Sequence, residues 1–335
     1  MTSLHTGGAL KNPVSVAILP LHARPLTMRQ AALWIADHHH RLAALRTQGI
    51  VIKVGGSIQD NPQTLRAICR DAAALVSLGL RPVLIHGGGK AITAAMNAAG
   101  LTARFVQGQR YTDAATLAIV EKVLAGQINR EILGYLADER APAQGLHTLA
   151  GGGGVLYAKR TPAPPAKEGD PGEDLGLVGR VTRVNTPLII GLCEAGVVPV
   201  IAPVAFDLAV PAKPATSDTP AAPPGRLNVN ADLAAGTIAA ALGAHAFILV
   251  SDTPGVRLSA DADAPTAASM TKKDYQQAAA SGAIAGGMVP KLDACYEALA
   301  AGVKRVAIVD GRESGALLTA VLSEPGEPVP GTWVA

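Results

Sequence analysis

Two lysines that stand close to glycines are the residues of this 335-residue sequence best suited to hold a phosphate group. Lys53 is followed by Gly55 and Gly56, and Lys291 comes four residues after Gly287. Glycines let backbone N–H groups approach a phosphate, and a lysine beside them adds a compact positive charge. Phosphoryl transfer requires positive charge around the moving group, so the two lysines could hold that group from opposite sides.

Between these two turns in the chain lies another glycine turn, His86–Lys90, with three consecutive glycines before its lysine, so it is the second turn and the one before Lys291 is the third. None of the three turns contains the Walker A pattern or the G-x-G-x-x-G pattern of dinucleotide-binding proteins. One such turn is weak support for a phosphate site, because glycine turns also end strands for steric reasons. All three fall at expected sheet edges, and their combination favours phosphate binding.

The stretch Leu227–Asp232 predicts a carboxylate between the two lysines. In an extended strand alternate side chains share a face, so Asn228, Asn230 and Asp232 would line up, and an alanine-rich helix would start at the last of them. Two lysines aimed at one site repel each other, so a carboxylate must hold them in place. The two amides could orient an acceptor. The alternative interpretation is an Asx-rich turn in which Asp232 is an ordinary helix N-cap.

The elements that must position these residues alternate between strand and helix from Ile50 onward. Such alternation predicts a mainly parallel sheet covered on both faces, in a three-layer α/β/α architecture. The expected strands are Ile50–Val54, Pro82–His86, Val178–Val184, Val197–Ala202, Phe247–Val250 and Arg305–Val309. Helices are expected to begin near Asn61, Asp113, Thr186, Asp232, Thr271 and Lys291.

The remaining segments do not follow this alternation. Residues 1–25 show no sustained period and predict a loose extension. Thr27–Gln30 fits a capping box, and the apolar spacing after it predicts a helix within residues 26–48. The tracts 158–176 and 207–225 are rich in proline and in small or polar residues, so they predict long hairpin tips or mobile loops.

Composition excludes several classes of function. Hydrophobic residues make up 49% and charged residues 16%, as in a compact globular protein. A net charge of +3 and only 3% aromatic residues argue against DNA or RNA as a partner. No run reaches the roughly 18 apolar residues of a membrane span, and no clean signal-peptide core is present, so we expect a cytoplasmic protein. Cys69, Cys193 and Cys295 form no C-x-x-C pair, so we expect buried thiols and no metal site.

Several motifs, in chain order, resemble those of the N-acetyl-L-glutamate kinases in the amino acid kinase family. Motifs that occur together in order are more specific than any single one, and these cover nearly everything from residue 50 onward. The matching stretches are Val51–Gly56, His86–Gly89, Phe105–Asp113, Asn228–Gly236, Ser251–Val256, Gly286–Lys291 and Gly302–Arg312. The resemblance implies the two-lobed amino acid kinase fold, with an N-terminal extension and helix (1–25 and 26–48), an acceptor-binding and dimerisation lobe (49–242) and a nucleotide-binding lobe (243–335).

The implied activity is ATP-dependent phosphorylation of the side-chain carboxylate of N-acetyl-L-glutamate. The product would be N-acetyl-L-glutamyl 5-phosphate, an intermediate of arginine biosynthesis. By the same resemblance, Lys53 and Lys291 would bind the transferring phosphoryl group, and Asp232 would organise both lysines.

The resemblance also implies how the acceptor is held. Arg110 and Asn228 would grip the α-carboxylate, for which the two-pronged guanidinium is suited, and Asn230 would help close the site. Two stretches depart from the family pattern. Leu149–Gly152 stands where the family often has a Gly-Lys-Asp turn, and Gln109–Tyr111 replaces Leu-Arg-Val, so contacts with the acceptor near residues 149–154 stay open.

The nucleotide contacts follow from the resemblance as well. Backbone N–H groups of Gly55, Gly56, Gly88 and Gly89 would hold phosphate oxygens. Mg²⁺ would travel with ATP and need few protein ligands. The residues expected around the adenosine are Asp252, Gly255, Arg257, Ala283, Ile284 and Ala285.

Two alternative functions deserve comparison with this one. A related kinase of lysine biosynthesis acts on a carrier-bound aminoadipate, but its acceptor strand reads Asn-Thr-Asp-Gly-Asp where this chain has Asn228–Asp232. Carbamate, aspartate and UMP kinases share glycine turns but not this combination of motifs. A non-catalytic small-molecule sensor on the same fold would have no use for two lysines around a γ-phosphate.

Assembly is also expected from the resemblance. Kinases of this kind form homodimers through the N-terminal lobe, and those inhibited by arginine carry an N-terminal helix that links dimers into a hexamer. The helix within 26–48 therefore predicts a homodimer that can join into a hexamer, with arginine as a candidate inhibitor bound between that helix and the C-terminal segment. Three prolines within 323–331 would reshape one wall of such a site.

Overall fold

The computed structural model describes residues 27–106, 108–149, 154–162, 172–211, 224–259, 261, 264–324 and 326–335. Two compact units are present, Met1–His40 and Arg41–Ala335. The extension expected at residues 1–25 lies outside the described residues. No described helix is both long and apolar enough to cross a membrane.

Helix α1 (Met28–Leu45) starts with the expected capping box. The backbone N–H of Thr27 donates to Gln30 Oε1 at 2.9 Å, and the backbone N–H of Gln30 donates to Thr27 Oγ1 at 3.3 Å. These reciprocal bonds satisfy two donors that a helix start otherwise leaves without partners. Large apolar side chains of α1 are exposed at Met28, Leu33, Trp34 and Ile35.

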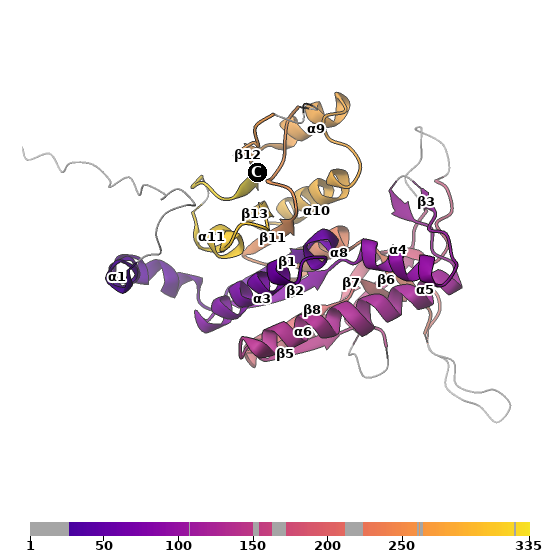
Figure 1. Ribbon diagram of the computed structural model, residues 1–335, viewed down its shortest axis with the longest axis horizontal. Coiled ribbons are helices and arrows are strands. Elements are labelled where there is room, and N and C mark those ends of the chain that lie inside the picture. Colours follow the sequence, from indigo (N-terminus) through magenta and orange to yellow (C-terminus); the bar gives the residue numbers. More distant parts are fainter. Residues whose placement is uncertain are drawn as a thin grey trace, which may run out of the picture. The chain divides into compact units, whose positions relative to one another are not determined.

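An eight-stranded sheet forms the centre of the second unit in the described residues (Figure 1). Its strand order is β12-β14-β13-β11-β1-β2-β8-β5, and every neighbouring pair is parallel except β13 and β14. The mainly parallel sheet expected from the sequence is therefore confirmed. The strands are β1 (Gly49–Val54), β2 (Arg81–His86), β5 (Ala143–Leu146), β8 (Val198–Ile201), β11 (Ala246–Ser251), β12 (Ser269–Met270), β13 (Arg305–Asp310) and β14 (Gly331–Val334).

Two apolar cores lie on opposite faces of this sheet. Ile52 of β1 and Ile248 of β11 belong to one core, and Val51 and Leu249 of the same strands belong to the other. Successive side chains of a strand point to opposite faces, so a fully apolar strand fills both cores and must be covered on both sides. This arrangement confirms the three-layer α/β/α architecture. One layer contains α2 (Gly56–Gln59), α3 (Pro62–Ser77), α4 (Gly89–Ala98), α5 (Ala114–Glu121), the π-helical segment η1 (Lys122–Ile128), α6 (Asn129–Asp138) and α11 (Ala316–Leu322), and the other contains α7 (Thr186–Glu194), α8 (Ala231–Leu242), α9 (Lys272–Ala280) and α10 (Met288–Ala300).

Helix boundaries follow local signals in the sequence. The Asn61 side chain accepts hydrogen bonds from Gln63 N and Thr64 N, and Pro62 occupies the first position of α3, where no intrahelical N–H donor is needed. Helix α8 ends at Gly243, whose φ of 56° is left-handed and costs glycine little. Both boundaries were expected from the sequence and are confirmed.

Four further strands form a separate sheet that closes on itself in the order β10-β7-β6-β9. Strand β7 was expected in the large parallel sheet, which is wrong: it pairs antiparallel with β6 and parallel with β10. The two proline-containing tracts connect antiparallel pairs, β6 with β7 and β9 with β10, while residues 163–171 and 212–223 lie outside the described residues. These strands are β6 (Leu156–Arg160), β7 (Val178–Val184), β9 (Val204–Asp207) and β10 (Arg226–Val229), and a two-stranded hairpin is formed by β3 (Phe105–Val106) and β4 (Gln109–Arg110).

Candidate active site

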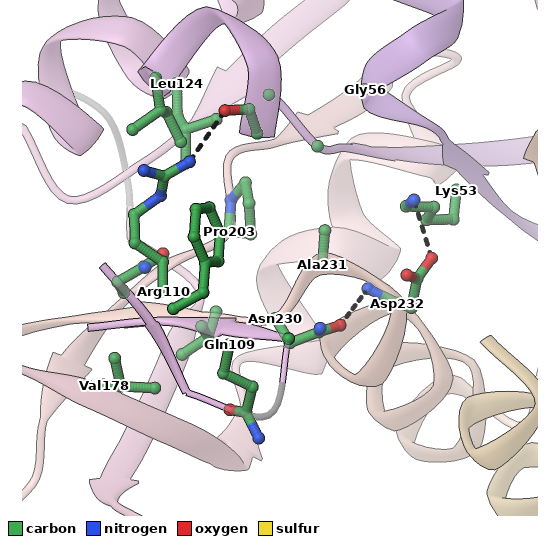
Figure 2. A pocket seen from close by; sticks show the side chains of 18 residues that line it. Lys53, Gly56, Gln109, Arg110, Leu124, Val178, Pro203, Asn230, Ala231 and Asp232 are labelled. Carbon is green, nitrogen blue, oxygen red and sulfur yellow. Dashed lines mark hydrogen bonds and ion pairs between the residues drawn. The ribbon is translucent and has the colours of Figure 1, made fainter. Parts of the chain in front are cut away.

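A carboxylate lies between two lysines at the carboxyl end of the central strands. Lys53 Nζ lies 2.7 Å from Asp232 Oδ1, and Lys291 Nζ lies 3.2 Å from Asp232 Oδ2. The first of these ion pairs is drawn in Figure 2. Lys53 comes from β1, Asp232 from the first turn of α8 and Lys291 from the first turns of α10, so three elements converge here. One carboxylate thus holds two ammonium groups that would otherwise repel each other.

Burial sets the electrostatics of this cluster. Lys53 is 4% exposed, and burial lowers its pKa; the positive charge of Lys291 lowers it further, while Asp232 works in the opposite direction. Asp232 is 7% exposed, and burial alone would raise its pKa. The two neighbouring ammonium groups outweigh that effect and hold the pKa of this carboxyl below its usual value. The carboxylate is therefore ionised at neutral pH.

The start of helix α8 differs from the expected row of polar side chains on one strand. Strand β10 ends at Val229, and the Asn230 side chain caps α8 by accepting from Asp232 N at 2.9 Å and Leu233 N at 3.1 Å. The prediction that one strand carries all three side chains is wrong, because the helix begins at Ala231, one residue earlier than the pattern suggested. Asp232 instead lies in the first helical turn, where the positive end of the helix dipole favours a carboxylate. The N-cap of α8 is Asn230, so the alternative assignment of that role to Asp232 is also wrong.

The first two glycine turns meet each other. A Cβ atom added to Gly56 would lie 3.3 Å from the backbone nitrogens of both Gly88 and Gly89. A Cβ atom on Gly88 would lie 2.5 Å from Leu124 Cδ2 and 2.7 Å from a methyl group of Ile128. Such close approaches of backbone and side chains favour glycine, which has no Cβ atom. The turns therefore form a compact surface of backbone amides, and α4, which starts at Gly89, contributes N–H groups without intrahelical partners.

Gly55 is placed differently from the other glycines. Its backbone N–H donates to the Val250 carbonyl at 2.9 Å, which joins the turn to strand β11. That N–H group is occupied within the protein, and Gly56, Gly87, Gly88 and Gly89 are the glycines of these turns that border the open site.

A cavity of about 250 Å³ lies over the glycine turns (Figure 2). The expected residues that line it are Lys53, Gly56, Gly88, Gly89, Arg110, Asn228, Asn230 and Asp232. Lys291 contacts Asp232 from outside this lining. The apolar part of the wall could not be predicted from the sequence, because apolar residues in an apolar-rich chain carry no local signal. That part of the wall includes Ile92, Phe105, Leu124, Val178, Pro203 and Val229.

Arg110 is the buried cation on the far side of this cavity. It is 8% exposed, and its guanidinium donates to Gly89 O at 2.9 Å and to Thr93 Oγ1 at 2.7 Å. The same group lies 4.7 Å from the centre of the Phe105 ring. Burial lowers the pKa of Arg110, but a guanidinium stays charged at all physiological pH values. Nearby, Asn228 Nδ2 donates to Thr112 Oγ1 at 3.1 Å, which fixes its amide.

A second cavity of about 670 Å³ adjoins the first. The two share Gly108, Gln109, Val178, Val229 and Asn230, so the space continues from the hairpin past the start of α8. Its other wall is formed by residues at the beginning of α10, including Gly286 and Gly287 of the third glycine turn. The third turn therefore lines a cavity that shares wall residues with the cavity over the first two turns.

The residues expected around adenosine lie outside both described cavities. Asp252 is exposed just after β11, and Gly255 is buried, with a φ of 124° and a Cβ position only 2.5 Å from Thr266 Cγ2. Arg257 forms an isolated bridge with Thr266, and Ile284 is 5% exposed in the apolar core. Ala283 and Ala285 precede α10. Their contact with a nucleotide stays a prediction.

Comparison with known proteins agrees with these motifs. The family model described as amino acid kinase family matches residues 48–310. An acetylglutamate kinase from Moorella thermoacetica is 37% identical over 83% of this chain and 88% of its own length. Another from Novosphingobium aromaticivorans is 36% identical over 82% of this chain and 88% of its own length.

Solved structures share the fold at lower identity. The N-acetylglutamate synthase from Neisseria gonorrhoeae, complexed with coenzyme A and N-acetyl-glutamate, superposes with a TM-score of 0.72 at 21% identity. The match covers 91% of this chain and 63% of that one. A carbamate kinase from Giardia superposes with a TM-score of 0.55 at 15% identity, covering 86% of this chain and 98% of that one. The family match and the relatives lead to one conclusion: this chain belongs to the amino acid kinase family.

Proposed function

We propose that this protein transfers the γ-phosphoryl group of ATP to the side-chain carboxylate of N-acetyl-L-glutamate, as a step of arginine biosynthesis. The observation that carries the proposal is Asp232 paired with both Lys53 and Lys291 beside a surface of backbone amides. Relatives with 36–37% identity bear the name acetylglutamate kinase, which supports the choice of acceptor. The product is an acyl phosphate.

Charge stabilisation is the main task in this reaction. Negative charge spreads over the oxygens of the moving phosphoryl group, and Lys53 and Lys291 meet it with two ammonium groups held by Asp232. The N–H groups around Gly56, Gly88 and Gly89 add donors that need no reorganisation, since their backbone is fixed by packing. Because Asp232 stays ionised, it keeps both lysines in place while the phosphoryl group passes.

The acceptor is assigned to the far side of the same cavity. Arg110 is held against α4 by Gly89 O, Thr93 Oγ1 and Met96 Sδ, and its other guanidinium hydrogens are assigned to the α-carboxylate of N-acetylglutamate. Asn228 and Asn230 offer amides from the end of β10 and the start of α8. An N-acetyl group removes the positive charge of the α-amine, so no unpaired ammonium is buried beside Arg110.

The nucleotide is assigned to the C-terminal part of the chain, residues 243–335, and the acceptor to residues 49–242. Mg²⁺ is expected to arrive as the ATP complex, where it neutralises phosphate charge. The described residues contain no group of three or more His, Cys, Asp or Glu that could form a metal cage of their own. Asp252, at the end of β11, is the acidic residue that we place nearest the nucleotide.

A coupled assay of ADP formation tests the proposed function. We expect turnover with ATP and N-acetyl-L-glutamate, and little turnover when free L-glutamate replaces the acetylated acceptor. Equal rates with the two acceptors would contradict the role of the acetyl group. No turnover with either acceptor, from a folded protein supplied with Mg²⁺, would contradict the proposal as a whole.

We propose in addition that the protein is a homodimer and that α1 joins dimers into a hexamer. Leu33 is 56% exposed and Ile35 is 54% exposed on this helix, which is unusual for side chains of this size. Light scattering should show a hexamer for the full chain and a dimer for a chain that begins at Gln48 and so lacks α1. Dimers from both would mean that α1 does not make the contact.

Arginine is proposed as an inhibitor through the C-terminal segment. The Arg41 guanidinium at the end of α1 already pairs with Glu324 Oε1 at 3.0 Å and Glu327 Oε2 at 3.2 Å. Free arginine carries the same group and would compete for these carboxylates. If millimolar arginine leaves kcat and the acceptor KM unchanged in both the native protein and Arg41→Ala, this part of the proposal fails.

A further inference from the structure

A buried histidine and a buried asparagine lie behind the second glycine turn. His86, the last residue of β2, is fully buried, and Asn129, the first residue of α6, is 1% exposed. His86 Nδ1 lies 3.0 Å from the carbonyl oxygen of Gly87, and Asn129 Nδ2 lies 3.3 Å from His86 Nε2. Asn129 Nδ2 also donates to Val200 O at 2.9 Å. Because a carbonyl can only accept and an amide nitrogen can only donate, these partners require a neutral imidazole with its proton on Nδ1.

This pair is not part of the cavity wall. Neither His86 nor Asn129 belongs to the lining of the cavity over the glycine turns, whereas Gly87 and Gly88 do. Burial and the neighbouring Lys53 lower the pKa of His86 to about 4, so the ring is neutral at physiological pH. The neutral ring is therefore unsuited to acid–base chemistry at neutral pH. Burying a polar ring costs free energy, so a role other than proton transfer must account for its position.

The peptide bond between Gly87 and Gly88 links the histidine to the site. In a trans peptide the C=O and the following N–H point in opposite directions, and no cis peptide is present in the described residues. A hydrogen bond that holds Gly87 O against His86 therefore turns the Gly88 N–H away from the ring. That nitrogen lies 3.3 Å from the Cβ position of Gly56, at the meeting point of the two turns.

Side-chain packing also restrains the same peptide. Leu124 and Ile128 of the π-helical segment η1 lie so close to Gly88 that a Cβ atom there would clash with both. Asn129 follows this segment directly, so the element that packs on Gly88 also supplies the donor to His86. A glycine pair is otherwise the most flexible backbone of a turn, and here a hydrogen bond and side-chain packing both restrain it.

We propose that His86 is a positioning residue, which, supported by Asn129, fixes the Gly87–Gly88 peptide so that the Gly88 N–H faces the phosphoryl group. The inference rests on the proposed kinase function, because it assigns that N–H to phosphoryl binding. Binding in the transition state depends on donors that are aimed in advance, and loss of one such donor costs about 10²–10³ in kcat. A Gly88 N–H that is still present but points in another direction should therefore lower kcat by part of that factor.

Three substitutions of His86 distinguish a role in orienting the Gly87–Gly88 peptide from a role in packing alone. His86→Asn places an amide nitrogen near the position of Nδ1 and keeps a donor for Gly87 O. His86→Gln places its amide near Nε2 instead, and His86→Leu has no donor. We expect kcat to fall about 10- to 100-fold in His86→Leu and His86→Gln but less than about fivefold in His86→Asn, with the acceptor KM within about threefold in each.

A matched control is His245→Leu, which removes a partly buried histidine just before β11, at the amino end of a strand, whereas His86 lies at the carboxyl end of one. We expect its kcat to equal that of the native protein. Affinity for the ATP–Mg²⁺ complex, measured by calorimetry without any acceptor, gives a second readout, and it should weaken by about three- to tenfold in His86→Leu but not in His86→Asn.

The outcomes distinguish the inference from the proposed function. A native enzyme that is active while His86→Asn and His86→Gln lose kcat equally, with unchanged melting temperatures, overturns only the role of His86. A native protein that does not phosphorylate N-acetylglutamate overturns the proposed function, and the calorimetric comparison then decides the role of His86 alone. If His86→Leu does not fold, the ratio of kcat between His86→Asn and His86→Gln decides, and a ratio near one overturns the inference.

Discussion

Replacing Asp232 by asparagine should disable the site by uncoupling its two lysines. The amide has the shape of the carboxylate but no charge, so one oxygen can still accept from one lysine while the NH₂ group faces the other. Lys53 Nζ and Lys291 Nζ both contact this side chain, at 2.7 Å and 3.2 Å, so two ammonium groups lose their shared counter-charge. Removing one partner from a buried ion pair costs about 3–5 kcal/mol, and we expect a loss of stability in this range.

The same substitution should change how the enzyme responds to pH. Burial and Lys291 lower the pKa of Lys53, and Asp232 is the group that raises it, so its pKa should fall further in Asp232→Asn. Between the lowered pKa of Lys53 in the folded protein and its ordinary value of 10.5, the unfolded chain binds more protons at Lys53, so stability rises with pH. In Asp232→Asn the folded pKa of Lys53 is lower still, so the pH range in which stability rises begins at a lower pH. Its melting temperature should therefore rise from neutral to mildly alkaline pH more steeply than that of the native protein.

Catalysis gives the second measurement on the same variant. We expect kcat to fall by about 10²–10³, and the alkaline limb of the pH–rate profile to move to lower pH, because protonated Lys53 is required. Asp207→Asn is the control, since Asp207 is another buried carboxylate, 2% exposed, whose partner Arg160 lies outside the site. An Asp232→Asn enzyme with native kcat, or with the native alkaline limb, would refute the proposed coupling of the lysines.

Three further variants test separate parts of the site. Lys291→Ala should lower kcat by more than it raises the acceptor KM, because its charge is needed mainly in the transition state; steady-state kinetics that show a change in KM alone would reverse this assignment. Arg110→Ala should raise KM for N-acetylglutamate about tenfold or more, with a smaller effect on kcat. Arg104 is an exposed arginine paired with Glu173, and the control Arg104→Ala should change neither constant. Gly88→Ala should lower stability by about 1–3 kcal/mol in chemical denaturation, since its methyl group would lie 2.5 Å from Leu124 Cδ2, and a native denaturation midpoint would contradict that packing.

Several features of this protein follow from local sequence alone. The strand β1 and the cap of α3 at Asn61 were predictable, because hydrophobic runs and capping residues act over a few neighbouring positions. The pairing of Lys53 and Lys291 with Asp232 was also predicted, because two buried ammonium groups near one phosphate demand a counter-charge. The spacing of these residues in the sequence could not predict the distances between their side chains, since Lys291 and Asp232 are 59 positions apart in the chain.

Other features were decided only by tertiary structure. Strand β7 could not be assigned to its own sheet from the sequence, because the partner of a strand is set by long-range pairing and not by its hydrophobic pattern. The anchoring of Arg110 by Gly89 O and Thr93 Oγ1 depends on the hairpin and α4 meeting in space. The contact of His86 with Asn129 depends on β2 meeting the start of α6, 43 positions later in the chain. Local sequence supplied the chemical groups of the site, and the packing of distant elements set their distances and burial, because those depend on contacts between residues far apart in the chain.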